Sequence, residues 1–358
     1  MEAIHDILQK ISTSNEGVLA TIIRVEGSAY RKEGTSMLFH QNGSRTGILS
    51  AGCLETDLEL RVKEWFGTSE PQTIVYHMQA EDDLSWGQGA GCNGIITVLL
   101  EPIDDQLLEH LIILKNHLEL GNRVTMIKQL DEHLSASSCL FMTDDGTIFG
   151  SWTGSNILSA KSLLKNYHLM PQKSGTLFST ELASNIYTHT FEPKPRLMIF
   201  GAGEDVIPLV DLANKTGFSV IVSDWRPALC NKEVFPKADQ LIVGFPMESL
   251  EKLTFFPTDS AIVVSHNFQR DKEYLQYLLT KEIRYLGVLG SKNRTQRLLE
   301  GNIIPPHVKS PIGLSIGAEG PEEIAVSIVA ELIQQQRKKS KEGITYEKWN
   351  HRHISCCG

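Results

Sequence analysis

An apolar strand that runs into two closely spaced glycines constrains this 358-residue chain more than any other stretch. Residues 197–200 are apolar, Gly201 and Gly203 follow, and the periodic run 206–216 predicts a helix. In a dinucleotide-binding fold the first glycine permits a tight turn, and the second lets a phosphate approach the backbone. A second apolar strand ends at Asp224, about where such folds place an acid that binds ribose. The order of these pieces predicts a Rossmann-like unit.

The turn itself departs from the usual fingerprint. Val206 replaces the third glycine, and Glu204 and Asp205 stand in the first turn of the expected helix. A helix N-terminus favours negative charge, and these two residues would supply it themselves. Two interpretations stay open: a structural Rossmann core whose acids cap the helix, or a ligand-binding turn whose acids point away.

Strands and helices alternate beyond the stiff linker 192–195, which contains two prolines. We expect strands at 196–200, 218–223, 240–243, 260–265 and 284–288. A final helix begins at Pro321, with acids in its first turn and basic residues at its end. The fold class predicted is α/β: a Rossmann-like doubly wound parallel sheet over residues 193–339, followed by a polar tail at 340–358.

The region before the linker contains apolar residues at both helix and strand spacing, which predicts an N-terminal α+β domain over residues 1–192. Its expected helices lie at 1–13, from about 54 to 66, at 105–120 and at 155–167. Its expected strands lie at 17–25, 36–40, 46–49, 73–77 and 95–100, in three runs within 123–152, near 175–180 and at 185–191. Residues 144–146 suit a hairpin turn.

Composition excludes several functional classes. A net charge of −9 argues against nucleic acid or an anionic membrane as the main partner. No apolar run approaches the roughly 20 residues of a membrane span, and no signal peptide is evident. The six cysteines are mostly scattered, which is typical of reduced thiols. We therefore expect a cytoplasmic protein.

Three glycine-bearing loops of the N-terminal region share a chemical character: residues 27–34, 50–55 and 87–94. Cys53 is expected near a helix N-terminus, where the dipole lowers the pKa of a thiol, and Cys92 lies among four glycines. The loops are either tight turns with two packing thiols or a shared ligand site. A zinc site is not favoured because neither cysteine belongs to a Cys-x-x-Cys pair.

Polar residues also follow the expected Rossmann strands, at the edge where such sheets bind ligands. Arg226 stands beside Asp224 and can bind a phosphate or pair with that acid, pairing being the more common outcome. His266 follows the fourth strand, and Ser291 lies in a basic turn that suits an anion.

Several motifs carry a family resemblance. They are Gly27-Ser28-Ala29-Tyr30-Arg31-Lys32-Glu33-Gly34, Gly52-Cys53-Leu54-Glu55, Gly91-Cys92-Asn93-Gly94, Gly201-Ala202-Gly203, Asp224-Trp225-Arg226-Pro227, His266-Asn267, Gly287-Val288-Leu289-Gly290-Ser291, Pro311-Ile312-Gly313-Leu314-Ser315-Ile316-Gly317-Ala318-Glu319 and Pro321-Glu322-Glu323-Ile324-Ala325. In this order they resemble the xanthine dehydrogenase accessory factor family, XdhC/CoxI, over nearly the whole chain. Ala51 and Asn93 stand where the family often has glycine, and the Cys356-Cys357 tail lies outside its pattern.

The resemblance implies a cytosolic chaperone rather than an enzyme. Such a chaperone binds molybdenum cofactor (molybdopterin), holds it during sulfuration by a cysteine desulfurase, and delivers it to a xanthine dehydrogenase-type apoenzyme. The resemblance and the loop chemistry together indicate these cofactor-binding residues: Arg31, Gly52, Cys53, Glu55, Cys92, Gly201, Gly203, Asp224, Arg226, His266 and Ser291. We expect them to face one cleft between the domains, and we expect a homodimer.

Two other functions remain open. One is an NAD(P)-dependent oxidoreductase that uses the Gly201–Gly203 turn, and the other is a structural adaptor without a cofactor. The oxidoreductase would bind nicotinamide cofactors; the chaperone would not.

Overall fold

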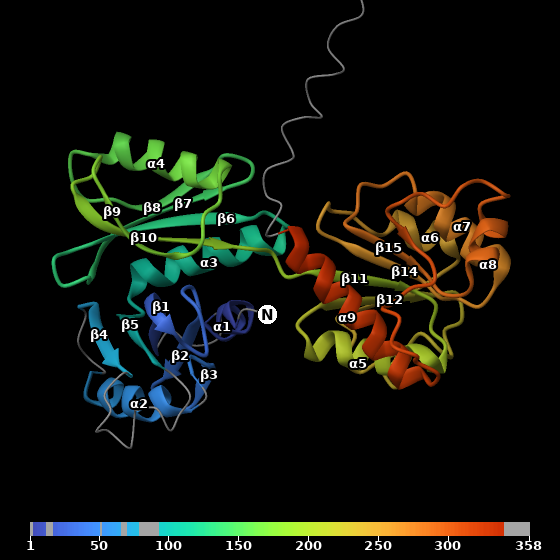
Figure 1. The fold of residues 1–358 in the computed structure, drawn as a ribbon, viewed down its shortest axis with the longest axis horizontal. Coiled ribbons are helices and arrows are strands. Elements are labelled where there is room, and N and C mark those ends of the chain that lie inside the picture. The colour runs from blue at the N-terminus through green and yellow to red at the C-terminus, as the bar shows by residue number, and fades with distance from the viewer. Residues whose placement is uncertain (1–2, 12–16, 51, 66–69, 79–92, 340–358) are drawn as a thin grey trace, which may run out of the picture. The chain divides into compact units, whose positions relative to one another are not determined.

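The computed structural model describes residues 3–11, 17–50, 52–65, 70–78 and 93–339. The chain divides into two compact units, unit 1 (Met1–Pro193) and unit 2 (Lys194–Gly358), at a boundary inside the proline-containing stretch 192–195 (Figure 1). No helix in the described ranges combines the length and the apolar character that crossing a membrane requires.

Unit 1 contains two five-stranded antiparallel sheets. The first has the order β3-β2-β1-β5-β4 and consists of β1 (Gly17–Ser28), β2 (Ser36–His40), β3 (Arg45–Gly47), β4 (Gln72–His77) and β5 (Asn93–Pro102). The second has the order β8-β7-β6-β10-β9 and consists of β6 (Val124–Leu130), β7 (Ala136–Thr143), β8 (Ile148–Ser151), β9 (Gly175–Ser179) and β10 (Ser184–Phe191).

Four helices complete unit 1 in alternating layers with the sheets (Figure 1). They are α1 (Ile4–Ile11), α2 (Cys53–Trp65), α3 (Asp105–Glu119) and α4 (Ile157–Leu169). Apolar residues of α1 and α3 share one core with both sheets, so these two helices lie between the sheets. α2 packs on the outer face of the first sheet, and α4 packs on the outer face of the second. Burial on both faces explains why β1 is mostly apolar from Gly17 to Ile23 without alternation, with Thr21 as the one polar side chain.

Unit 2 is a six-stranded parallel sheet with the order β13-β12-β11-β14-β15-β16. Its strands are β11 (Arg196–Phe200), β12 (Ser219–Asp224), β13 (Gln240–Val243), β14 (Ser260–Val263), β15 (Tyr285–Val288) and β16 (Val308–Lys309). α5 (Ile207–Lys215) and α9 (Pro321–Lys339) cover one face. α6 (Pro246–Glu251), α7 (Phe268–Leu278) and α8 (Lys292–Leu298) cover the other. In chain order the strands run 3-2-1-4-5-6, the Rossmann arrangement.

The predicted fold class is confirmed, including the five predicted strands of the parallel sheet. Two details differ. The third strand of unit 1 ends at Gly47 rather than at residue 49, because the chain turns there to reach α2. The short strand β16, at the edge of the parallel sheet, was not predicted.

Candidate functional site

The carboxyl edge of the parallel sheet gathers every unit 2 residue that the sequence singled out. The strand order reverses between β11 and β14, and open α/β sheets bind ligands at such a switch point. The residues lie in the loops that follow the strands, or at a strand's last position: Gly201 and Gly203 after β11, Asp224 and Arg226 at the end of β12, His266 after β14 and Ser291 after β15.

The glycine turn after β11 is packed against the protein's own groups. Gly201 has φ +133°, and a Cβ there would lie 2.4 Å from the Val264 carbonyl oxygen after β14. A Cβ on Gly203 would lie 2.4 Å from Asp205 Oδ1. Gly201 therefore requires glycine before any ligand is considered, whereas a side chain at position 203, where φ is −70°, would have to displace the Asp205 carboxylate.

Asp224 is fully buried, and its carboxylate is saturated by bonds from the same unit. Oδ1 accepts hydrogen bonds from the backbone N and the Nε of Arg226, both at 2.9 Å. Oδ2 accepts from Ala202 N at 2.9 Å and from Arg226 Nη2 at 2.7 Å. Burial alone would raise the pKa of Asp224, but the hydrogen bonds from Arg226 and Ala202 outweigh it and lower that pKa. Arg226 therefore pairs with Asp224, while phosphate binding by its remaining donors stays a prediction.

Arg226 is held rigidly at the edge of the sheet. Asp224 engages Nε and Nη2 of its guanidinium, and the guanidinium carbon lies 4.5 Å from the centroid of the Trp225 ring. The Arg226 side chain is still 39% exposed. A guanidinium has five N–H donors, so donors on Nη1 remain for an anionic ligand.

His266 stands in the left-handed region, with φ +56°, at the end of the loop that follows β14. Its Nε2 lies 2.8 Å from Asp205 Oδ2, in the short 3-10 turn η2 (Glu204–Val206) before α5. Non-glycine residues with this backbone conformation cluster at functional sites. The Asp205 carboxylate therefore lies beside the glycine turn, bonded to His266.

The Ser291 turn is organised around a buried acid that sequence reasoning missed. Ser291 caps α8 by accepting a hydrogen bond from Arg294 N at 3.3 Å. Arg294 Nη2 in turn bonds Asp271 Oδ2 at 2.6 Å, and Asp271 Oδ1 accepts bonds from the Ser265 backbone and hydroxyl. Asp271 links the loops after β14 and β15, and its position in the first turn of a helix was the only signal available for it.

In unit 1 the structure places the start of the first predicted loop beside residues 93 and 94, the described end of the third. Gly27 and Ser28, at the end of β1, pair with Gly94 and Asn93, at the start of β5. A Cβ on Gly94 would lie 2.5 Å from the Glu26 carbonyl oxygen, so the two loops meet through a close backbone contact. Cys92, the residue before Asn93, lies outside the described residues.

Glu55 shapes the loop that leads into α2. It is buried and accepts hydrogen bonds from Leu49 N at 3.0 Å, from Ser50 N at 2.7 Å and from the Ser50 hydroxyl. Burial alone would raise the pKa of Glu55, but the bonds from Ser50 and Leu49 outweigh it and lower that pKa. Gly52 has φ +117°, and Cys53 is the first residue of α2, as predicted; the Cys53 side chain lies outside the description. Glu55 therefore positions the backbone that carries Cys53.

Arg31 lies in the loop between β1 and β2. Its guanidinium carbon lies 5.4 Å from the centroid of the Tyr30 ring. Its Nε is buried and has no hydrogen-bond partner among the described residues. A buried guanidinium N–H without an acceptor is costly, so this atom is a reasonable donor for an anionic ligand.

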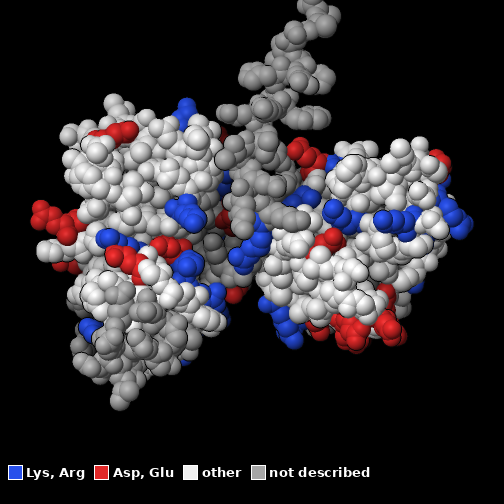
Figure 2. Space-filling view, viewed as in Figure 1, with Lys and Arg blue, Asp and Glu red and all other residues white. Residues whose placement is uncertain are grey.

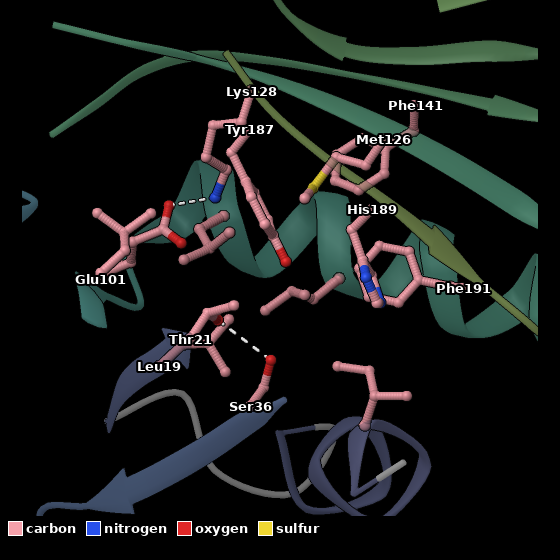
Figure 3. Close-up of a pocket in the computed structure, with 14 residues that line it drawn as sticks. Leu19, Thr21, Ser36, Glu101, Met126, Lys128, Phe141, Tyr187, His189 and Phe191 are labelled. Carbon is pink, nitrogen blue, oxygen red and sulfur yellow. Dashed lines mark hydrogen bonds and ion pairs between the residues drawn. The ribbon is translucent and has the colours of Figure 1, made fainter. Parts of the chain in front are cut away.

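A small internal cavity lies between the sheets of unit 1 (Figure 3). Its volume is about 30 Å³, which suits one water molecule and is far too small for a pterin. Glu101 and Lys128 form a buried ion pair on its wall, and Thr21 and Ser36 are hydrogen-bonded at 3.1 Å (Figure 3). Burial alone would lower the pKa of Lys128, but Glu101 outweighs it and raises that pKa. The cavity belongs to the core and not to the candidate site.

The comparisons with known proteins agree with this architecture. Three family models match successive parts of the chain: the XdhC and CoxI family over residues 11–77, the BH1974-like central domain over 105–192, and the XdhC Rossmann domain over 197–332. A Bacillus subtilis (strain 168) protein described as a probable xanthine dehydrogenase subunit is 46% identical over 339 residues, covering 94% of this chain and 99% of that protein.

The chain belongs to the XdhC and CoxI family.

Two further proteins extend the similarity. A crystal structure described as a xanthine dehydrogenase (BH1974) from Bacillus halodurans has a TM-score of 0.81 and 45% identity, covering 95% of this XdhC-type chain and 97% of the solved one. The molybdenum cofactor insertion chaperone PaoD of Escherichia coli (strain K12) is 22% identical over 333 residues, covering 91% of this chain and 85% of PaoD. Both similarities extend over nearly the whole chain and therefore over both units.

Proposed function

We propose that this protein binds molybdenum cofactor as cargo, holds it while a cysteine desulfurase sulfurates it, and inserts it into a xanthine dehydrogenase-type apoenzyme in the cytoplasm. The observation that carries the proposal is the similarity to PaoD, a molybdenum cofactor insertion chaperone, over 91% of this chain and 85% of PaoD. A carrier needs reversible binding rather than turnover.

Arg226 is the residue that we assign to the phosphate of molybdopterin. Asp224 and Trp225 fix its guanidinium, so little side-chain entropy is lost when an anion binds to the remaining N–H donors. Gly201, Gly203, His266 and Ser291 border the same sheet edge and complete this part of the proposed site.

Unit 1 contributes the other proposed contacts. The buried Nε of Arg31 is a second donor for an anionic group. Gly52 and Glu55 hold the start of α2, where Cys53 is the first residue, and Cys92 precedes the strand that meets the Arg31 loop. Soft thiolates at these positions would suit molybdenum.

The alternative, an NAD(P)-dependent oxidoreductase, is disfavoured by the state of Asp224. Binding a ribose requires a carboxylate with free acceptor positions, whereas Asp224 accepts four hydrogen bonds from its own unit and is 0% exposed.

Paired binding measurements test the proposal. We expect equilibrium dialysis to show molybdopterin binding, and a fluorescence titration with NADH to show none. Arg226→Ala should weaken molybdopterin binding by about tenfold or more, and the loss should shrink as salt rises. Arg226→Lys keeps the charge without the planar fork and should recover part of the affinity.

Arg45→Ala is the matched control, because Arg45 is an exposed arginine on β3 that no part of the proposed site contains. Thermal melting of each variant reports whether it folds. Binding of NADH together with no binding of molybdopterin would overturn the proposal in favour of the oxidoreductase.

A further inference from the structure

A row of exposed apolar and basic side chains borders the carboxyl edge of unit 2, on the face covered by α6, α7 and α8. It consists of the exposed residues Phe245, Met247, Phe268 and Arg297 together with Arg270, which is half-buried and ion-paired with Glu273 at 3.0 Å; we call these five residues the α6–α8 rim. Phe245 is 48% exposed, Met247 51% and Phe268 39%, although each is large and apolar. The remaining apolar residues of these helices largely form the buried core beneath them.

Two arginine–aromatic pairs connect neighbouring helices within this rim. The guanidinium carbon of Arg270 lies 4.7 Å from the centroid of the Phe245 ring, linking α7 to the start of α6. The guanidinium carbon of Arg297 lies 5.3 Å from the centroid of the Phe268 ring, linking α8 to the start of α7. Each arginine thus lies over an aromatic ring, and ordering it on binding costs less entropy.

The composition of the rim is that of the centre of a protein interface. Aromatic residues, methionine and arginine are enriched at such interfaces relative to the rest of a protein surface. Tryptophan, tyrosine and arginine are the residues whose replacement by alanine most often weakens an interface strongly. The rim contains arginine beside other aromatic side chains. An apolar surface of this kind, exposed beside a candidate binding site, indicates a partner.

The charges on and beside α8 indicate the charge that a partner surface would carry. The whole chain carries a net charge of −9, yet α8 contains three basic residues and no acidic one. Asp271 neutralises Arg294, at 2.6 Å. Among the described residues no carboxylate lies within ion-pair distance of Lys292 or Arg297, both of which are exposed. Figure 2 shows Lys and Arg side chains over α7 and α8, while Asp and Glu gather beside the start of α9.

We propose that the α6–α8 rim docks the cofactor-requiring apoenzyme, through a surface of that enzyme that presents carboxylates beside apolar side chains. This rests on the proposed function for the identity of the partner. Phe268 follows His266 and the helix cap Asn267 directly in the chain, so a partner seated on the rim lies beside the loop after β14. The cofactor would then be released next to its recipient.

The test compares binding of a cofactor-free xanthine dehydrogenase-type apoenzyme to the parent and to the variant Phe245→Ala/Phe268→Ala/Arg297→Glu, by biolayer interferometry. We expect the variant to bind the apoenzyme at least about tenfold more weakly and with less dependence on salt. Its molybdopterin affinity in equilibrium dialysis should equal that of the parent.

Phe178→Ala is the matched control, because Phe178 is 61% exposed on β9 of unit 1 and should not affect docking. Arg297→Lys keeps the charge and should retain most of the binding. Equal apoenzyme binding by the parent and the triple variant would overturn the docking proposal, as would a parent that does not bind the apoenzyme at all.

Two further results separate the docking proposal from self-association through the rim and from the proposed function. If the triple variant loses self-association in light scattering but keeps the apoenzyme, the rim joins two copies of this chain and the proposal is wrong. If the parent binds the apoenzyme but no molybdopterin, the proposed function fails. The docking proposal is then decided only by comparing the apoenzyme affinity of the parent with that of the triple variant.

Discussion

Replacing Asp224 by Asn isolates the structural role of the acid that a dinucleotide fold would use for ribose. The carboxylate accepts four hydrogen bonds, three of them from Arg226. A hydrogen bond to a charged group is worth about 1.5–3 kcal/mol. Asn retains an acceptor for one or two of the four bonds, and water can solvate the Arg226 side chain, which is 39% exposed. We therefore expect the variant to lose about 2–4 kcal/mol of unfolding free energy at pH 7.

The pH dependence of this loss has a definite sign. The hydrogen bonds lower the pKa of Asp224 in the folded protein below its unfolded value of about 3.9. A lowered carboxyl pKa stabilises the fold fully above the unfolded pKa, and this contribution disappears as the pH falls through the folded pKa. The difference between the parent and Asp224→Asn should therefore be largest near pH 7 and shrink below about pH 4.

Urea unfolding followed by circular dichroism measures the loss, with the transition of unit 2 analysed separately because a two-unit chain need not unfold in one step. Asp211→Asn is the control; Asp211 is a partly buried acid on α5 of the same unit, and we expect a change within about 0.5 kcal/mol. The reasoning is refuted if Asp224→Asn is as stable as the parent. It is also refuted if the parent binds NADH and the variant does not.

Three other expectations concern the core, the thiols and assembly. Lys128→Met leaves Glu101 as an unpaired buried charge, since the two side chains are 7% and 8% exposed, and the variant should lose about 3–5 kcal/mol of unfolding free energy in urea. Adding Glu101→Gln should recover part of this loss. If the single and the double variant lose the same free energy, the two residues are not a coupled pair. Cys53→Ser/Cys92→Ser should weaken molybdopterin retention in dialysis without lowering the melting temperature if either thiol contacts molybdenum, whereas unchanged retention would make both thiols structural. Light scattering at micromolar concentration should give the mass of a homodimer, and a monomeric mass would remove that expectation.

Local sequence patterns predicted unit 2 because its strands and helices follow one another directly along the chain. The apolar run before Gly201 and the final helix from Pro321 each have a boundary signal in the sequence. β16, only Val308 and Lys309, is too short to show any periodicity, and α6 and α8 span fewer than two full turns. Such elements are defined by the sheet on which they pack.

The arrangement of unit 1 and of the candidate site depends on contacts that a linear pattern does not contain. β1 pairs with β5, far along the chain, and this pairing is what brings Gly27 beside Gly94. The contact between His266 and Asp205 joins residues 61 positions apart, and the left-handed backbone of His266 has no sequence signature. Asp224 and Arg226, by contrast, are only two residues apart. Their opposite charges were enough to make an ion pair the more common of the two outcomes expected from the sequence.

Native mass spectrometry of the protein from a cofactor-producing host measures the central claim most directly. We expect a bound mass equal to that of molybdenum cofactor, absent when the host cannot make the cofactor. Adding cofactor-free xanthine dehydrogenase-type apoenzyme should move that mass from this protein to the enzyme. A protein that carries no such mass, or that keeps it in the presence of the apoenzyme, would contradict the account of a cofactor carrier that delivers its cargo.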